Sequence, residues 1–345
     1  MPSISFKAPD IAIDLGSSNT MVYVRKHGLA ISEPTLVVVN TENRHMVRAV
    51  GDEARYLLGR TRDTLTAISP IENGTITDVD AVAVLIGYFI RKAIGVNHLF
   101  PPRVLVSIPV GTPAVSRRAI YEAVRKNKCN KVYLVEKVLS AAIGSGLPIY
   151  DPVGSMVVDI GGGTTDAAII SLGGLVVSRS VPVGGSRMDE AIVSYLKNNS
   201  SMLIGTRMAE EIKIDLAAAL PSRENRHVHV RGRDLLSAHA MDVEFTSAQA
   251  YEAVREPCMA ILATIKWVLE RTPPELAADI MRGGIHLTGG ASQLLGLDQF
   301  IGQQTGIPVL LAKNPEDATV SGMGHILENE ELLNEIMNSS LNRNK

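Results

Sequence analysis

Residues 156–166 constrain the fold most strongly, because an apolar run leads into Asp159 and then into a turn made almost wholly of Gly and Thr. The apolar run predicts a buried strand, and glycines at 161–163 let backbone N–H groups approach an anion with no Cβ in the way. A second apolar run, residues 167–172, follows where a dinucleotide-binding fingerprint would require a helix. A P-loop is excluded because no Gly-Lys-Ser/Thr triplet occurs. The stretch therefore predicts a β-hairpin tip that binds phosphate.

The same pattern occurs near the start of the chain. Residues 11–24 contain an apolar strand, Asp14, a Gly turn, a Thr six residues after the Asp and a returning strand. A third small-residue turn, residues 286–292, precedes a helical pattern. Two phosphate hairpins followed by a Gly-Gly turn resemble the actin, Hsp70 and sugar-kinase superfamily. We therefore expect an α/β, actin-like (ribonuclease H-like) fold with duplicated domains and a nucleotide cleft between them.

Bulk composition narrows the class of protein. The 345 residues, 46% of them hydrophobic, suffice for one large or two ordinary domain cores. A net charge of −2 gives no global attraction to nucleic acid, which we do not expect as a partner. The two cysteines lack CxxC spacing, so a reducing, cytoplasmic setting fits best. The longest apolar run, residues 81–90, is about half the length of a spanning helix, and we expect no integral membrane segment.

The chain is expected to divide near residue 150. The first half would cover residues 1–150 with a small subdomain at about 33–78, and the second residues 151–345 with a small subdomain at about 187–246. The apolar periodicity predicts helices in both halves. The longer ones are expected at residues 79–94, 116–127, 136–144, 188–198, 206–218, 247–270 and 294–305.

Six motifs give a closer resemblance, to the bacterial actin MreB family, along nearly the whole chain. They lie at residues 14–20, 32–35, 159–166, 184–192, 205–213 and 287–291. The resemblance implies a protein that binds ATP or ADP and polymerises into membrane-associated, antiparallel double filaments. In wall-bearing cells this family organises cell-wall synthesis and rod shape.

The resemblance and the chemistry of the turns together assign phosphate and metal ligands. Backbone N–H groups of both turns are expected to hold the β- and γ-phosphates, with Thr20 and Thr165 as hydroxyl donors. Asp14 and Asp159, at the strand ends, are expected to hold hydrated Mg²⁺, which keeps several waters and takes one or two carboxylates. The turn residues are Gly16, Ser17, Ser18, Asn19, Gly161, Gly162, Gly163 and Thr164.

The resemblance also suggests an adenosine site. Glu210 and Lys213, one turn apart on a predicted helix, look like the family's adenosine contacts. Gly289 and Gly290, followed by Ala291, are expected to pass close beneath the base. A plain i,i+3 surface ion pair between Glu210 and Lys213 is the alternative.

One departure from the family concerns hydrolysis. The family usually has Glu-Glu-Pro before the helix equivalent to residues 139–144, and its second Glu positions the attacking water. Here the residues are Glu136, Lys137 and Val138. A charged Lys cannot accept a proton from water, so we expect ATP binding with slow hydrolysis at a catalytic position formed by Lys137, Glu136 and Thr165. A local register shift that gives Glu136 the role is the alternative.

Membrane contact would be peripheral, at the inner face of the cell membrane. Leu99 and Phe100 occupy the place of an apolar membrane-touching loop in related proteins, and inward packing is the alternative. The basic run at residues 125–131 lacks interleaved aromatic residues and is expected to be a solvated helix end. His227 and His229 share one strand face, but the sequence suggests no third metal ligand.

The leading hypothesis is a nucleotide-dependent filament protein that governs cell shape. A small-molecule kinase of the same superfamily is the enzyme alternative, but the short subdomains offer little to build a substrate pocket. An Hsp70-type chaperone is disfavoured because no peptide-binding segment follows residue 345. The Lys137 departure suggests a divergent paralogue such as those linked to shape and swimming in wall-less helical bacteria. Its partners would be itself, the membrane surface and related actins or shape and motility proteins.

Overall fold

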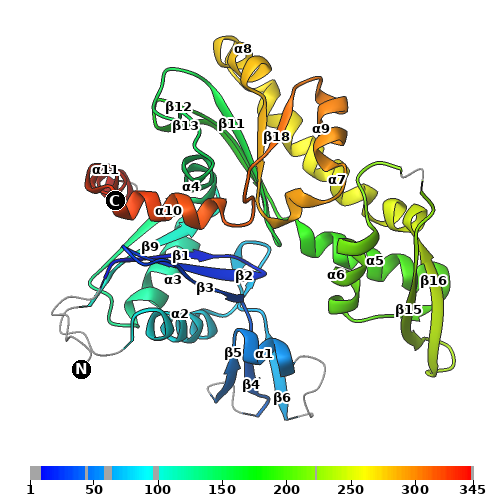
Figure 1. The fold of residues 1–345 in the computed structure, drawn as a ribbon. Coiled ribbons are helices and arrows are strands. Elements are labelled where there is room, and N and C mark those ends of the chain that lie inside the picture. The colour runs from blue at the N-terminus through cyan, green and yellow to red at the C-terminus, as the bar shows by residue number, and fades with distance from the viewer. Residues whose placement is uncertain (1–8, 43–45, 58–63, 96–100, 222–223, 343–345) are drawn as a thin grey trace. The chain divides into compact units, whose positions relative to one another are not determined.

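The computed structural model describes residues 9–42, 46–57, 64–95, 101–221 and 224–342 (Figure 1). The chain forms two compact units, Met1–Ile149 with Glu316–Lys345, and Tyr150–Pro315. The change of unit at residue 150 lies beside the expected boundary. The C-terminal segment, however, returns to the first unit instead of ending the second, because its apolar side chains pack on the first unit's sheet.

The first unit is built on a five-stranded sheet of order β10-β9-β1-β2-β3. Strand β1 pairs antiparallel with β2 and parallel with β9, and β9 pairs parallel with β10. Because side chains alternate along a strand, Ile11 and Ile13 face one core while Ala12 faces another. The strands are β1 (Ile11–Leu15), β2 (Asn19–Val24), β3 (Gly28–Pro34), β9 (Arg103–Ile108) and β10 (Lys131–Glu136).

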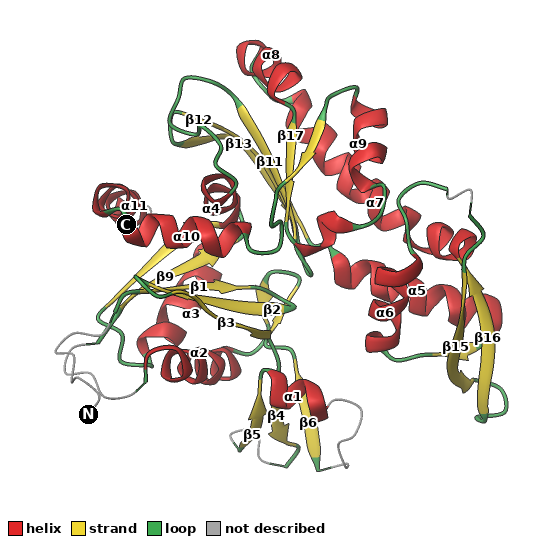
Figure 2. Ribbon diagram, viewed as in Figure 1, coloured by secondary structure: helices red, strands yellow, loops and turns green. Residues whose placement is uncertain are grey.

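Helices cover both faces of this sheet (Figure 2). Side chains of α2 (Val79–Ile94) and α3 (Ala114–Arg125) fill the core on the face of Ile11 and Ile13. On the other face lie α4 (Lys137–Gly144), α10 (Ala318–Glu328) and α11 (Glu330–Asn342).

A smaller sheet in the first unit has the order β5-β4-β6, with helix α1 packed on it. Its core contains Val38, Ala49 and Ala54. A two-stranded hairpin, β7-β8, follows before α2. The elements are β4 (Val37–Asn40), β5 (Val47–Val50), α1 (Asp52–Leu57), β6 (Leu65–Ile68), β7 (Ile71–Glu72) and β8 (Thr75–Ile76).

The second unit repeats the topology of the first. Its main sheet has the order β18-β17-β11-β12-β13, with β11 antiparallel to β12 and parallel to β17. The two sheets therefore correspond strand for strand, which is the duplication expected from the paired turns. The strands are β11 (Ser155–Ile160), β12 (Thr165–Ser171), β13 (Gly174–Val181), β17 (Ile285–Thr288) and β18 (Val309–Leu311).

Helices of the second unit share one large core with the inward face of β11. A small sheet of order β14-β15-β16 joins the same core through Met202, Val230 and Phe245. The elements are α5 (Gly185–Ser200), β14 (Met202–Leu203), α6 (Thr206–Leu216), β15 (His227–Asp234), β16 (Ala240–Thr246), α7 (Ser247–Glu270), α8 (Pro274–Gly283), the 3-10 turn η1 (Gly290–Gln293) and α9 (Leu297–Thr305).

Two glycines let α4 and α10 cross with their backbones in contact. A Cβ at Gly322 would lie 1.8 Å from the carbonyl oxygen of Ser140, and one at Gly144 would lie 1.9 Å from that of Ala318. No side chain fits at either position. The close approach of α4, which begins at Lys137, to α10 therefore requires glycine at both positions.

Candidate functional site

The two predicted hairpins have the same register. In the first unit the last pair of β1 and β2 is Leu15 with Thr20, and in the second unit the last pair of β11 and β12 is Ile160 with Thr165. The aspartate of each motif is the second-to-last residue of its strand. Each unit thus presents an aspartate one residue before a short Gly-containing turn.

Each turn is closed by the same hydrogen bond. The amide of Gly16 donates to the carbonyl of Asn19 at 3.2 Å, and the amide of Gly161 donates to the carbonyl of Thr164 at 2.9 Å. A Cβ at Gly16 would lie 2.4 Å from the carbonyl oxygen of Asn19, so this position requires glycine.

A neighbouring hydroxyl orients each aspartate. The Ser107 hydroxyl on β9 donates to Oδ1 of Asp14, and the Thr288 hydroxyl on β17 donates to Oδ1 of Asp159 at 2.9 Å. Both hydroxyls come from the parallel strand beside the aspartate's own. The roles of Ser107 and Thr288 were not predicted from the sequence, although a hydroxyl residue at or near the end of each of these strands was a visible signal.

Lys137 lies directly on the first of these carboxylates. Its Nζ is 2.9 Å from Oδ1 of Asp14, and the two side chains are 11% and 13% exposed. The preceding Glu136 ends β10, and its Oε1 lies 3.6 Å from Nη2 of Arg117 on α3. The structure therefore places Lys137 beside Asp14, while Glu136 makes an ion pair with α3.

The threonine hydroxyls are used within the fold. Thr35 donates its single proton to the carbonyl of Gly16 at 2.7 Å, so in the 2.8 Å contact between the two hydroxyls Thr20 is the donor. The Thr165 hydroxyl donates to the carbonyl of Val183 at 2.7 Å. Both protons are directed at protein oxygens, and donation by Thr20 and Thr165 to phosphate stays a prediction.

The start of α5 holds the turn of the second hairpin. The amide of Gly185 donates to the carbonyl of Gly161 at 3.0 Å, and that of Ser186 to the carbonyl of Gly162 at 2.8 Å. In a trans peptide the C=O and the following N–H point in opposite directions. The amides of Gly162 and Gly163 are therefore directed away from α5, as donors to a phosphate on that side require.

Residues predicted to contact the nucleotide gather around Gly185. A Cβ built at Gly185 would lie 3.2 Å from Nζ of Lys213, 3.5 Å from Cβ of Ala291 and 3.8 Å from Cα of Gly162. Lys213 also donates to the carbonyl of Gly185 at 3.3 Å and pairs with Asp189 at 2.9 Å. Burial raises the pKa of Asp189 above its ordinary value, although the positive charge of Lys213 acts to lower it.

The Gly-Gly turn lies against the end of β11. Gly289 has φ of +83°, and a Cβ there would lie 2.3 Å from the carbonyl oxygen of Ile160. Gly290 and Ala291 continue into η1. Glu210, on α6, is half-buried. Lys213 forms its 2.9 Å ion pair with Asp189, which was not predicted as its partner from the sequence.

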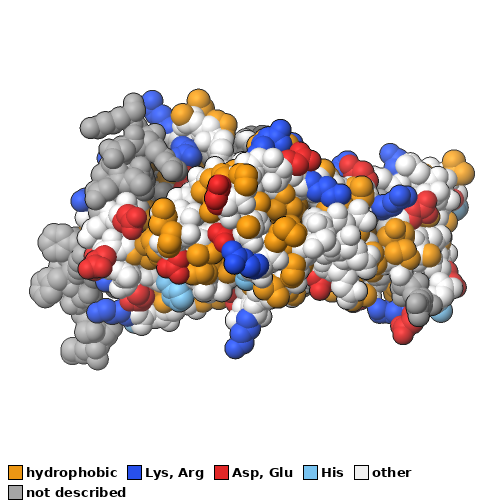
Figure 3. Space-filling view, turned by 90° about the horizontal axis from the view of Figure 1, so that it is seen from above, with side chains coloured by type: hydrophobic (Ala, Val, Ile, Leu, Met, Phe, Trp, Pro, Cys, Tyr) orange, Lys and Arg blue, Asp and Glu red, His pale blue; other side chains and the backbone are white. Residues whose placement is uncertain are grey.

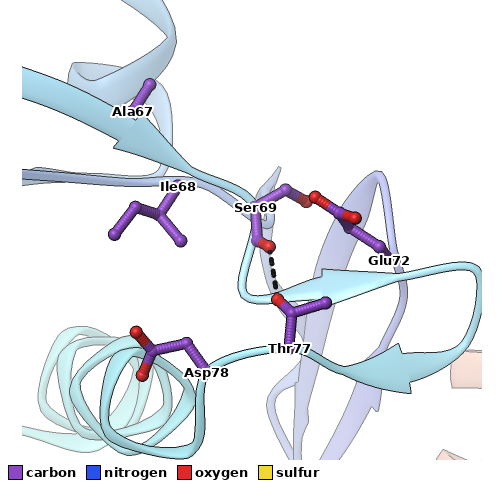
Figure 4. Close-up of a pocket in the computed structure, with 6 residues that line it drawn as sticks. All are labelled: Ala67, Ile68, Ser69, Glu72, Thr77 and Asp78. Carbon is purple, nitrogen blue, oxygen red and sulfur yellow. Dashed lines mark hydrogen bonds between the residues drawn. The ribbon is translucent and has the colours of Figure 1, made fainter.

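A separate pocket lies in the first unit, between the end of β6, the β7-β8 hairpin and the start of α2 (Figure 4). The Thr77 hydroxyl donates to the carbonyl of Ser69 at 3.0 Å, and Asp78 caps α2 by accepting from the amide of Ala81. The charged groups that line it, Glu72 and Asp78, are both acidic. None of the predicted nucleotide contacts lines this pocket, and its charge does not suit phosphate.

Other predicted features fall elsewhere. Within the described ranges, no group of three His, Cys, Asp or Glu side chains could hold a metal ion, and His229 lies 3.5 Å from Asp242. Among the same residues, no helix has the length and apolarity to cross a bilayer. Leu99 and Phe100 lie outside the described residues.

The surface carries both signs of charge. Lys126, in the basic run, pairs with Asp80 at 2.8 Å, and Arg125 lies over the ring of Tyr121. On the face seen in Figure 3, Lys and Arg are interspersed with acidic and hydrophobic side chains. Lys126 and Arg125 are therefore both engaged with neighbouring side chains of the first unit.

Sequence comparison identifies close relatives over nearly the full length. A family model described as "MreB/Mbl protein" matches residues 8–335. The chain is 42% identical over 327 residues to the cell shape-determining protein Mbl of Bacillus subtilis (strain 168), covering 94% of this chain and 98% of Mbl. It is 42% identical over 323 residues to the cell shape-determining protein MreB of Escherichia coli (strain K12), covering 92% and 93%.

Structural comparison agrees with the sequence relatives. The crystal structure of MreB5 of Spiroplasma citri bound to AMPPNP superposes with a TM-score of 0.89 at 29% identity, covering 96% of this chain and 98% of that one. The same protein bound to ADP gives a TM-score of 0.88, covering 97% and 99%. The expected actin-like fold is thereby confirmed.

Proposed function

Because the chain belongs to the MreB/Mbl family, we propose that it is a nucleotide-dependent bacterial actin that binds ATP and ADP and assembles into shape-determining filaments. The observation that carries the proposal is the pair of hairpins with identical register, each with an aspartate before a turn closed by a Gly amide. The names of the relatives support a filament protein over a small-molecule kinase, since they are described as cell shape-determining proteins.

In this proposal each of the two turns binds nucleotide phosphate. Amides of Gly162 and Gly163, directed away from α5, would donate to the phosphates. Lys213 and Ala291, close to Gly185, would contact the adenosine, with Gly289 allowing the base to approach. The AMPPNP- and ADP-bound states of S. citri MreB5 support nucleotide binding.

The two aspartates differ in how well they suit Mg²⁺. When bound with ATP, Mg²⁺ would neutralise part of the polyphosphate charge. Asp159 fits as a holder of its waters, because its carboxylate ends a buried strand and is oriented by Thr288. Asp14 does not fit in the same way, because its Oδ1 already receives the Ser107 hydroxyl and the Lys137 ammonium.

We further propose slow ATP hydrolysis. A water-positioning carboxylate is replaced by Lys137, whose ammonium is engaged with Asp14 and cannot accept a proton while it is charged. Glu136 is not positioned to replace that carboxylate, because it ends the preceding strand and lies near Arg117. Nucleotide exchange would then govern filament turnover more than hydrolysis does.

The filaments are proposed to lie at the inner face of the cell membrane. Leu99 and Phe100 are the proposed contacts, and burial of two such side chains gives at most roughly 3–5 kcal/mol. That affinity is too weak for one subunit but adds along a polymer. Further proposed partners are related actins and shape or motility proteins.

Sedimentation with and without ATP tests the assignment. We expect the protein to pellet with ATP and to show filaments in negative stain, with no phosphorylation of a panel of sugars. Sugar phosphorylation without pelleting would overturn the filament proposal in favour of a kinase.

A further inference from the structure

The Lys137–Asp14 ion pair is built into the first unit. Lys137 is the first residue of α4, directly after β10, so its backbone position is set by the sheet and by the α4–α10 crossing. The Ser107 hydroxyl donates to the same oxygen, Oδ1 of Asp14. Both charged side chains are largely buried, and a long Lys side chain is ordered there at a cost in conformational entropy.

The pair changes the charge of this half of the site. Asp14 with Lys137 sums to zero, whereas Asp14 with a Glu at that position would sum to −2. Replacing Glu by Lys therefore adds two positive charges, as many as one Mg²⁺ carries. Because the groups are poorly exposed, solvent and salt screen this difference less than they would at the surface.

The position of the ammonium also affects the metal. A hydrated Mg²⁺ that used Asp14 would compete with Lys137 for Oδ1, which lies 2.9 Å from Nζ. Like charges repel, so the ammonium lowers the gain from placing a cation beside Asp14. It also removes the repulsion that an unneutralised carboxylate would exert on the polyphosphate.

Resting on the proposed ATP binding, we propose that Lys137 is a built-in cation of the nucleotide site that makes ATP binding largely independent of Mg²⁺. Lys137 is a positioning and charge-neutralising residue in this account. Its substitution by Glu restores a requirement for the divalent cation.

The test is an equilibrium titration of a fluorescent ATP analogue, followed by anisotropy below the polymerisation concentration, with either Mg²⁺ or excess EDTA. The quantity compared is the ratio of the dissociation constant in EDTA to that in Mg²⁺. We expect a ratio below about 3 for the wild type and a ratio at least about tenfold larger for Lys137→Glu, because two charges change beside the phosphates.

Three further variants complete the design. Lys137→Arg keeps the charge and should retain the wild-type ratio, while Lys137→Met should raise it even if Lys137→Glu fails to fold. The matched control is Lys126→Glu, which reverses a Lys in an exposed ion pair with Asp80 and should leave the ratio unchanged.

The outcomes separate the inference from the proposed function. Equal ratios in the wild type, Lys137→Met and Lys137→Glu would overturn the role of Lys137 and leave ATP binding intact. A wild type that binds no nucleotide even with Mg²⁺ would overturn the proposed function and this inference together.

Discussion

The α4–α10 crossing predicts a specific loss of stability in Gly322→Ala. The new Cβ would lie 1.8 Å from the Ser140 carbonyl oxygen and 2.8 Å from the Gly144 amide nitrogen. An ordinary contact needs about 3.4 Å, so α10 would have to move by roughly 1.5 Å, and overpacking of this kind costs about 1–3 kcal/mol. Both neighbours are backbone atoms and cannot rotate away. Alanine recovers at most about 1 kcal/mol of helix propensity.

The expected net loss is about 1–2 kcal/mol, or roughly 2–8 °C in melting temperature for a unit of this size. Gly302→Ala, within α9, is the matched control, because its Cβ would meet atoms at 3.6 Å and beyond. Calorimetric melting of both variants measures the difference, and hydrogen exchange identifies the unit that opens. A Gly322→Ala protein that melts with or above Gly302→Ala would refute the backbone-contact argument.

Three other predictions concern activity, membranes and pH. Lys137→Glu should raise phosphate release at least about tenfold, since positioned acid–base groups contribute about 10²–10⁴-fold; no gain would contradict the slow-hydrolysis proposal. Replacing Leu99 and Phe100 by Ser should abolish filament co-sedimentation with anionic liposomes, and unchanged binding would count against the membrane contact. Burial lowers the pKa of His286 below 6.5, so the unfolded state binds the proton first and stability should fall as pH drops below that value. His286→Gln should reduce the difference between the urea unfolding midpoints at pH 7.5 and 5.5. An unaltered difference would show that His286 is not the source of the pH dependence.

Local chemistry made much of the fold predictable. The spacing of Asp, Gly and Thr was enough to predict both hairpins, because a short turn determines the register of the two strands that it joins. Helix α2 was predicted over its observed range, since Asp78 caps its start and Gly95 follows its end. Helix α7 likewise begins at a capping box formed by Thr246 and Gln249.

Features that depend on long-range packing were not predicted from the sequence. Helix α8 was not among the helices expected from the sequence, although Pro274 at the first helical position favours a new helix. The return of α10 to the first unit depends on glycines that contact a distant helix. Ser107 and Asp189 contact their partners only through tertiary structure, so the sequence did not show which residues they would contact.

The central proposal is that each of the two matched turns binds nucleotide phosphate. Electron cryo-microscopy of filaments grown with ATP tests it most directly. The account predicts nucleotide density whose phosphates contact residues 16–19 and 161–164, with Lys137 still on Asp14. Phosphate density bound by one turn alone, or at another place in the chain, would contradict it.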